Sequence, residues 1–143
     1  GVVGRKTAII TGLSIIILVL VGGEIKNIID RERPELANDM YLLEEESKKS
    51  YPSGHALIVS AGATGVVCLY RGTVRRKIIS LLLVIEAGLV IFSRIYLGLH
   101  YPLDIVAGIL LGISVTFFFL GCQKQIDSLS KKIFSFIKTR KVT

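Results

Sequence analysis

Residues 102–121 read PLDIVAGILLGISVTFFFLG, a stretch in which Asp104 is the only charged side chain. A helix of about 20 apolar residues is long enough to cross the hydrocarbon core of a bilayer. A helix on the surface of a soluble bundle would have a polar face, and this stretch has none. Three further apolar runs of similar length precede it, at residues 7–23, 53–70 and 78–97. The sequence therefore predicts an all-α fold, a polytopic membrane bundle of four transmembrane helices formed by one domain over residues 1–143.

The first apolar run follows Arg5 and Lys6, an arrangement that is also typical of a signal peptide. The run leads into GGEIKNIIDRERP at residues 22–34 and not into a small-residue cleavage site. We therefore expect it to be retained as a membrane span. The first residue is Gly1 and not methionine, which indicates a processed end or missing upstream sequence.

The chain has 143 residues and a formal net charge of +7, and its basic residues are unevenly distributed. Twelve of its 18 Lys and Arg residues lie before the first run, between the second and third, or after the fourth: Arg5, Lys6, Arg71, Arg75, Arg76, Lys77, Lys124, Lys131, Lys132, Lys138, Arg140 and Lys141. The positive-inside rule assigns these segments to the cytoplasm. Both termini are thus predicted to be cytoplasmic, and segment 24–52 and the turn at 93–104 extracytoplasmic.

This topology accounts for the basic charge, so anionic lipid headgroups are the expected partner and nucleic acid is not. Apolar residues recur at helical spacing among the lysines of residues 122–143. This pattern predicts a cytoplasmic amphipathic tail that lies on the membrane surface.

The extracytoplasmic side combines cations with the start of a helix. Lys26, Arg33 and Arg94 lie at span ends, and Ser53 and Gly54 begin the second span. A helix N-terminus presents unpaired N–H groups and a positive dipole end, which favour a phosphate group. Each feature also has a structural reading, since basic residues at span ends commonly anchor the helix and Pro-Ser-Gly commonly forms a turn. Together they predict a binding site for a polyanionic group.

Both histidines of the chain, His55 and His100, fall on this same side. His100 and Asp104 are four residues apart, so they share a face if the fourth helix has begun by His100. The carboxylate could then hold one ring nitrogen and leave the other as a nucleophile, with His55 as the acid for the leaving oxygen. Pro102 biases Tyr101 away from helical geometry, which leaves this arrangement open. Asp104 could alternatively cap the helix.

Three motifs occur in order along the chain: Lys26, six residues and Arg33-Pro34; Pro52-Ser53-Gly54-His55; and Ser93-Arg94, five residues, His100, three residues and Asp104. They resemble the three signatures of the type 2 phosphatidic acid phosphatase family, within the acid phosphatase–haloperoxidase superfamily, at all eleven specified positions. The match is specific because it needs all three motifs in sequence. The chain is therefore similar to membrane-bound lipid phosphatases.

The resemblance implies roles for these residues. His100 would attack phosphorus to form a phosphohistidine, Asp104 would orient it, and His55 would protonate the leaving group. The implied phosphate-binding residues are Lys26, Arg33, Ser53, Gly54 and Arg94. Because the family uses no metal, no metal ligand and no cofactor are expected.

The resemblance leaves the number of spans, the substrate and the exact reaction open. Membrane members of the family typically have six spans with the motifs on the last four, so this chain corresponds to a compact or a truncated version. Whether a partner or a homo-oligomer supplies the remaining substrate-entry surface is left open by the sequence. A polyprenyl diphosphate is the favoured substrate, with phosphatidate and phosphatidylglycerophosphate as alternatives. A lipid phosphotransferase with the same intermediate and a non-catalytic lipid-binding protein are the competing functions.

Overall fold

The computed structural model describes residues 2–34 and 49–140. These residues are almost entirely helical. The helices are α1 (Val2–Ile29), α3 (Gly54–Leu69), α4 (Val74–Tyr96), α5 (Pro102–Gly121) and α6 (Gln123–Arg140). Of these, α1, α4 and α5 are long and apolar enough to cross a membrane, and α3 is a shorter apolar helix of 16 residues. The predicted all-α fold with four apolar helices is confirmed.

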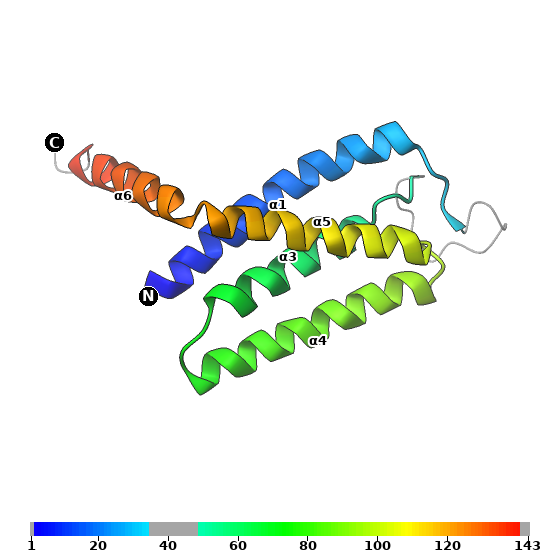
Figure 1. The fold of residues 1–143 in the computed structure, drawn as a ribbon, viewed down its shortest axis with the longest axis horizontal. Coiled ribbons are helices and arrows are strands. Elements are labelled where there is room, and N and C mark those ends of the chain that lie inside the picture. Colours follow the sequence, from blue (N-terminus) through cyan, green and yellow to red (C-terminus); the bar gives the residue numbers. More distant parts are fainter. Residues whose placement is uncertain (1, 35–48, 141–143) are drawn as a thin grey trace.

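Helix α3 lies at the centre of the bundle, where it packs against α1, α4 and α5 (Figure 1). Successive apolar helices run in opposite directions. The start of α1, the α3–α4 turn and the end of α5 lie at one end of the bundle, and the end of α1, the start of α3 and the α4–α5 turn lie at the other (Figure 1). The second of these ends therefore gathers all three sequence motifs.

Small residues let α5 approach α3 closely. A Cβ atom added at Gly108 would lie 2.8 Å from the Ser53 carbonyl oxygen, and one added at Gly112 would lie 2.7 Å from the Leu57 carbonyl oxygen. Apolar helices in a bilayer gain little hydrophobic free energy by associating, so close packing of this kind is what would hold such helices together there. The contact at Gly108 also fixes the position of Ser53 along the axis of α5.

Helix α1 continues to Ile29, six residues beyond the predicted end of the first span at Gly23. Glycine inside a helix costs only about 1 kcal/mol relative to alanine, and Gly22 here packs against Leu57 of α3. The helix ends at Asp30, whose φ of 48° is left-handed and whose N–H donates to the Lys26 carbonyl oxygen at 3.1 Å. The connection predicted to begin at residue 24 therefore begins at Asp30, and its residues 35–48 lie outside the described part of the chain.

The predicted tail helix is observed as α6, which begins two residues after α5 ends. Lys6 near the start of α1 forms an ion pair with Asp127 of α6. This pair ties the tail to the end of the bundle opposite the motifs (Figure 1).

Candidate active site

The sequence-predicted site residues come from four separate segments that meet at one end of the bundle. Lys26 lies in the last turn of α1, and Arg94 lies in the last turn of α4. The other segments contribute Arg33 just after α1, Ser53, Gly54 and His55 at the start of α3, and His100 and Asp104 at the start of α5. The structure thus brings all eight residues to the same end of the bundle.

Ser53 joins the second motif to the third. Its side-chain oxygen caps α3 by accepting from the Ala56 N–H at 3.4 Å, and its own N–H donates to the Asp104 carbonyl oxygen at 3.1 Å. Ser53 and Asp104 are both fully buried. The N-terminus of α3, which is the positive end of the helix dipole, is therefore held directly beside the start of α5.

The structure defines how His100 and Asp104 meet, which the sequence left open because of Pro102. Helix α5 begins at Pro102, and Tyr101 is extended, with φ −70° and ψ 151°, so His100 lies outside the helix. The condition for a shared helical face is therefore not met, because proline takes the first helical position and keeps Tyr101 extended. The chain nevertheless turns so that His100 Nδ1 lies 3.7 Å from Asp104 Oδ2.

Asp104 also caps helix α5, which was the alternative role that the sequence allowed for it. Its Oδ2 atom accepts from the Tyr101 N–H at 3.0 Å, in the manner of an acidic residue in the first turn of a helix. The distance of 3.7 Å to His100 is longer than a hydrogen bond but within ion-pair range when the ring is positively charged. One carboxylate can thus cap α5 and stabilise positive charge on His100.

The turn that precedes His100 is held by two arginines. The N–H groups of Leu99 and His100 donate to the Arg94 carbonyl oxygen at 3.1 and 3.2 Å, and Arg33 Nη1 donates to the Leu99 carbonyl oxygen at 3.0 Å. Gly98 supplies the left-handed φ of 69° that this tight turn requires. Arg33 is 1% exposed, so its guanidinium is part of the interior of the site as well as a candidate phosphate ligand.

Arg31 is a residue of this site that the sequence reasoning missed. Its Nη1 atom donates to Asp104 Oδ1 at 3.0 Å, and its guanidinium carbon lies 4.1 Å from the centre of the Tyr101 ring. Asp104 is therefore held through both oxygens, Oδ1 by Arg31 and Oδ2 by the Tyr101 N–H. In the sequence Arg31 is one charge among many in a polar segment, and only its position two residues before Arg33 sets it apart.

The backbone around Arg31 is anchored by the residues just before α3. The Ser50 N–H donates to the Arg31 carbonyl oxygen at 2.8 Å, and Glu32 and Lys49 form an isolated antiparallel bridge. The fully buried Ser50 hydroxyl also bonds to the carbonyl oxygens of Arg31 and Glu32. These bonds fix the approach of Arg31 to Asp104.

Comparison with known proteins agrees with this arrangement. The sequence model of the PAP2 superfamily matches residues 7–127, which include every motif, helices α3 to α5 and all but the first five residues of α1. The chain belongs to the PAP2 superfamily. The matched range contains the motif residues that the fold gathers at one end of the bundle.

Named PAP2 relatives are longer than this chain. An undecaprenyl-diphosphatase from Sulfolobus acidocaldarius is 40% identical over 136 residues, which is 94% of this chain and 63% of that protein. Phosphatidylglycerophosphatase B from Bacillus subtilis is 28% identical over 120 residues, or 76% of this chain and 54% of that protein. The chain thus spans less than two thirds of the length of these relatives.

A solved structure is similar as well. The crystal structure of a transmembrane PAP2-type phosphatidylglycerolphosphate phosphatase from Bacillus subtilis matches with a TM-score of 0.65 and 27% identity. The match covers 86% of this chain and 60% of that one. The bundle described here therefore has the architecture of a transmembrane PAP2 protein.

Proposed function

We propose that this protein is an integral-membrane lipid phosphatase that acts through a phosphohistidine at His100 and needs no metal ion. The observation that carries the proposal is the position of His100. It is 2% exposed, lies 3.7 Å from a fully buried carboxylate, and lies at the same end of the bundle as the motif cations and the N-terminus of α3. A buried histidine beside a carboxylate is arranged to carry positive charge during a reaction.

In the proposed first step, His100 attacks the phosphorus atom and the bond from phosphorus to the leaving oxygen breaks. Because Nδ1 faces Asp104, the attacking atom is Nε2. His55 gives its proton to the leaving oxygen, and the Asp104 carboxylate offsets the positive charge on the phosphorylated ring. In the second step water attacks phosphorus, His55 takes a proton from that water, and the bond from phosphorus to nitrogen breaks.

The phosphoryl oxygens would be held by positive charge that the chain itself provides. Lys26, Arg33 and Arg94 supply fixed cations, and the α3 N-terminus at Ser53 and Gly54 supplies backbone N–H groups. A Cβ atom at Gly54 would meet no atom within 4 Å, so the backbone is open to a ligand there. These groups take the place that metal ions have in other phosphoryl-transfer sites.

For the substrate we propose a polyprenyl diphosphate ahead of a glycerolipid phosphate. The undecaprenyl-diphosphatase shares 40% identity over nearly the whole of this chain, whereas the phosphatidylglycerophosphatase shares 28% over a shorter part. The charge distribution further supports cytoplasmic termini and an extracytoplasmic site. A reporter inserted after Lys48 is therefore expected to be active outside the cell, and a cytoplasmic signal would reverse this orientation.

A substrate panel under chelation tests the proposed function. Purified protein in detergent micelles is given undecaprenyl diphosphate, phosphatidate or phosphatidylglycerophosphate in excess EDTA, and released phosphate is measured. We expect release to continue with EDTA and to be fastest from the diphosphate. A magnesium-dependent phosphatase, inhibited in parallel, verifies the chelation. Loss of all activity with EDTA would contradict metal independence, and a faster rate with a glycerolipid phosphate would contradict the substrate.

A further inference from the structure

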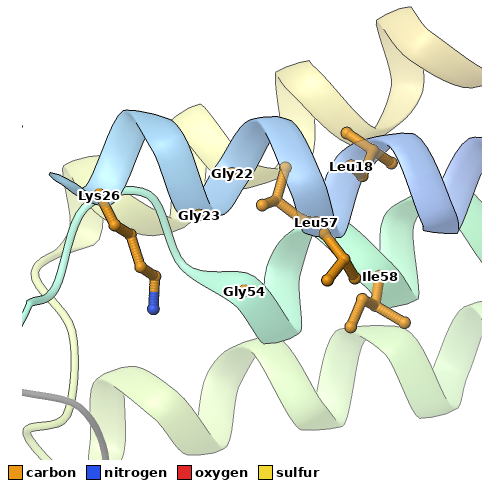
Figure 2. A pocket seen from close by; sticks show the side chains of 8 residues that line it. Leu18, Gly22, Gly23, Lys26, Gly54, Leu57 and Ile58 are labelled. Carbon is orange, nitrogen blue, oxygen red and sulfur yellow. The ribbon is translucent and has the colours of Figure 1, made fainter. Parts of the chain in front are cut away.

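Three basic residues at the end of α1 and just after it are directed to different parts of the site. Figure 2 shows the Lys26 side chain extending from α1 toward the start of α3 at Gly54. Arg33 donates to a backbone carbonyl oxygen in the turn between α4 and α5 at 3.0 Å. Arg31 instead donates to the side chain of Asp104, from Nη1 to Oδ1 at 3.0 Å. Lys26 and Arg33 are motif positions, whereas Arg31 is not, so its contact calls for an explanation of its own.

The contact with Arg31 fixes the rotation of a carboxylate that has two further contacts. Asp104 Oδ2 accepts from the Tyr101 N–H at 3.0 Å and lies 3.7 Å from His100 Nδ1. Rotation about the Cβ–Cγ bond of aspartate is only weakly restricted, so a hydrogen bond to one oxygen does not by itself fix the plane of the carboxylate. Arg31 holds the other oxygen, and the two bonds together keep Oδ2 facing His100.

Arg31 also compensates the charge of this buried carboxylate. Asp104 is fully buried, and a buried charge is costly unless it is paired and hydrogen-bonded. A histidine that attacks phosphorus is neutral before the reaction, so at that stage the paired charge comes from Arg31. The carboxylate is thus in place before positive charge develops on the His100 ring, which is the condition for electrostatic preorganisation.

Arg31 is itself held at its side chain and at its backbone. Its guanidinium carbon lies 4.1 Å from the centre of the Tyr101 ring, which is a cation–π contact. Its carbonyl oxygen accepts from the Ser50 N–H at 2.8 Å and from the Ser50 hydroxyl at 3.2 Å. The approach of the guanidinium to Asp104 is therefore fixed by residues on both sides of it in the chain.

We infer that Arg31 is a positioning residue, which holds the Asp104 carboxylate toward His100 while the phosphohistidine forms. This inference rests on the proposed phosphatase function, and it adds a residue that is not a specified position of the three motifs. Arg31 acts on the reaction through Asp104 and not through the substrate. Its loss should therefore slow the chemical step and leave the affinity for substrate nearly unchanged.

The variant Arg31→Gln tests this inference. Its kcat and KM are measured for phosphate release from undecaprenyl diphosphate in detergent micelles with excess EDTA. We expect kcat to fall at least about tenfold, because a misplacement of about 1 Å can lower a rate by about 10²-fold, and KM to change less than about twofold. Arg31→Lys keeps the charge and a donor, so it should retain more of the wild-type kcat than Arg31→Gln.

Lys49→Gln is the matched control for the loss of a cation at this end of the bundle. The Lys49 side chain is 34% exposed, as is that of Arg31, and it pairs with the exposed carboxylate of Asp30 at 3.0 Å. Its backbone bridge with Glu32 does not depend on the side chain. We expect this variant to match the wild type in both kcat and KM.

Arg31→Gln combined with Asp104→Asn separates positioning from a merely structural role. In Asp104→Asn the negative charge that Arg31 holds is absent, so the added loss of Arg31 should lower kcat by less than about twofold. A structural role would lower kcat by the same factor in both backgrounds. Thermal unfolding of each variant is followed in parallel, and if Arg31→Gln fails to fold, Arg31→Lys replaces it in the same comparison.

An unchanged kcat in the folded Arg31 variant would overturn the inference. A raised KM with the wild-type kcat would overturn it as well, because Arg31 would then bind the substrate. An equal factor of loss in both backgrounds would show that Arg31 acts independently of Asp104. A wild-type protein that releases no phosphate from undecaprenyl diphosphate, phosphatidate or phosphatidylglycerophosphate would instead contradict the proposed function on which the inference rests.

Discussion

Replacement of His100 with alanine is expected to lower phosphate release from every lipid substrate by at least about 10³-fold, as for the loss of a covalent nucleophile. Only one other residue has an imidazole nitrogen that could act as the nucleophile, because the chain has only one further histidine, His55. His55 lies at the start of α3, whereas His100 is the histidine that faces the buried carboxylate. No other described side chain has both the chemistry and the position to replace it.

The measurement is a steady-state rate with undecaprenyl diphosphate in EDTA, with thermal unfolding followed in parallel. Because His100 is buried, the alanine variant also leaves a space in the turn before α5. His100→Gln, which fills more of that space and can still form hydrogen bonds, should be equally inactive. Retention of more than about a tenth of the wild-type rate by either folded variant would exclude His100 as the nucleophile.

Replacement of Asp104 with asparagine is expected to lower turnover by about 10² to 10⁴-fold, as for the loss of a carboxylate that orients a catalytic histidine. The substitution separates the two roles of this residue. The asparagine side-chain oxygen can still accept from the Tyr101 N–H and cap α5, whereas the negative charge that faces His100 and Arg31 is lost. A residue that served only as a cap would tolerate this change.

Asp30→Asn is the matched control for charge. Asp30 forms an ion pair with Lys49 at 3.0 Å near the same end of the bundle, but its side chain is 70% exposed. Exposed pairs contribute at most about 1 kcal/mol to stability, so this variant should keep nearly full activity. Equal turnover of Asp104→Asn and Asp30→Asn would contradict the electrostatic role of Asp104.

The helices and the gathering of the motifs could be predicted from sequence because their signals are local. Apolar length marks the run at 102–121 as a membrane helix, and motif spacing marks His100 and Asp104. The end of α1 differs from the end of the apolar run. The run stops at Gly23, whereas α1 continues to Ile29 and ends at Asp30, which has a left-handed φ.

The role of Arg31 could not be predicted because it depends on contacts between distant segments. Arg31 reaches a carboxylate 73 residues later in the chain, and its backbone is fixed by Ser50. In the local sequence, only its position two residues before Arg33 distinguishes it from the other charges of the same segment. The geometry at Pro102 was left open for a related reason, since the meeting of His100 and Asp104 depends on the extended conformation of Tyr101.

The central claim is that phosphate passes through a covalent bond to His100. The most direct measurement is to mix the purified protein with radiolabelled undecaprenyl diphosphate in excess EDTA, quench within milliseconds, and map the labelled peptide by mass spectrometry. The account predicts an alkali-stable, acid-labile phosphate on His100 in the wild type and none in His100→Ala. Label on another residue, or full turnover with no labelled protein at any quench time, would contradict it.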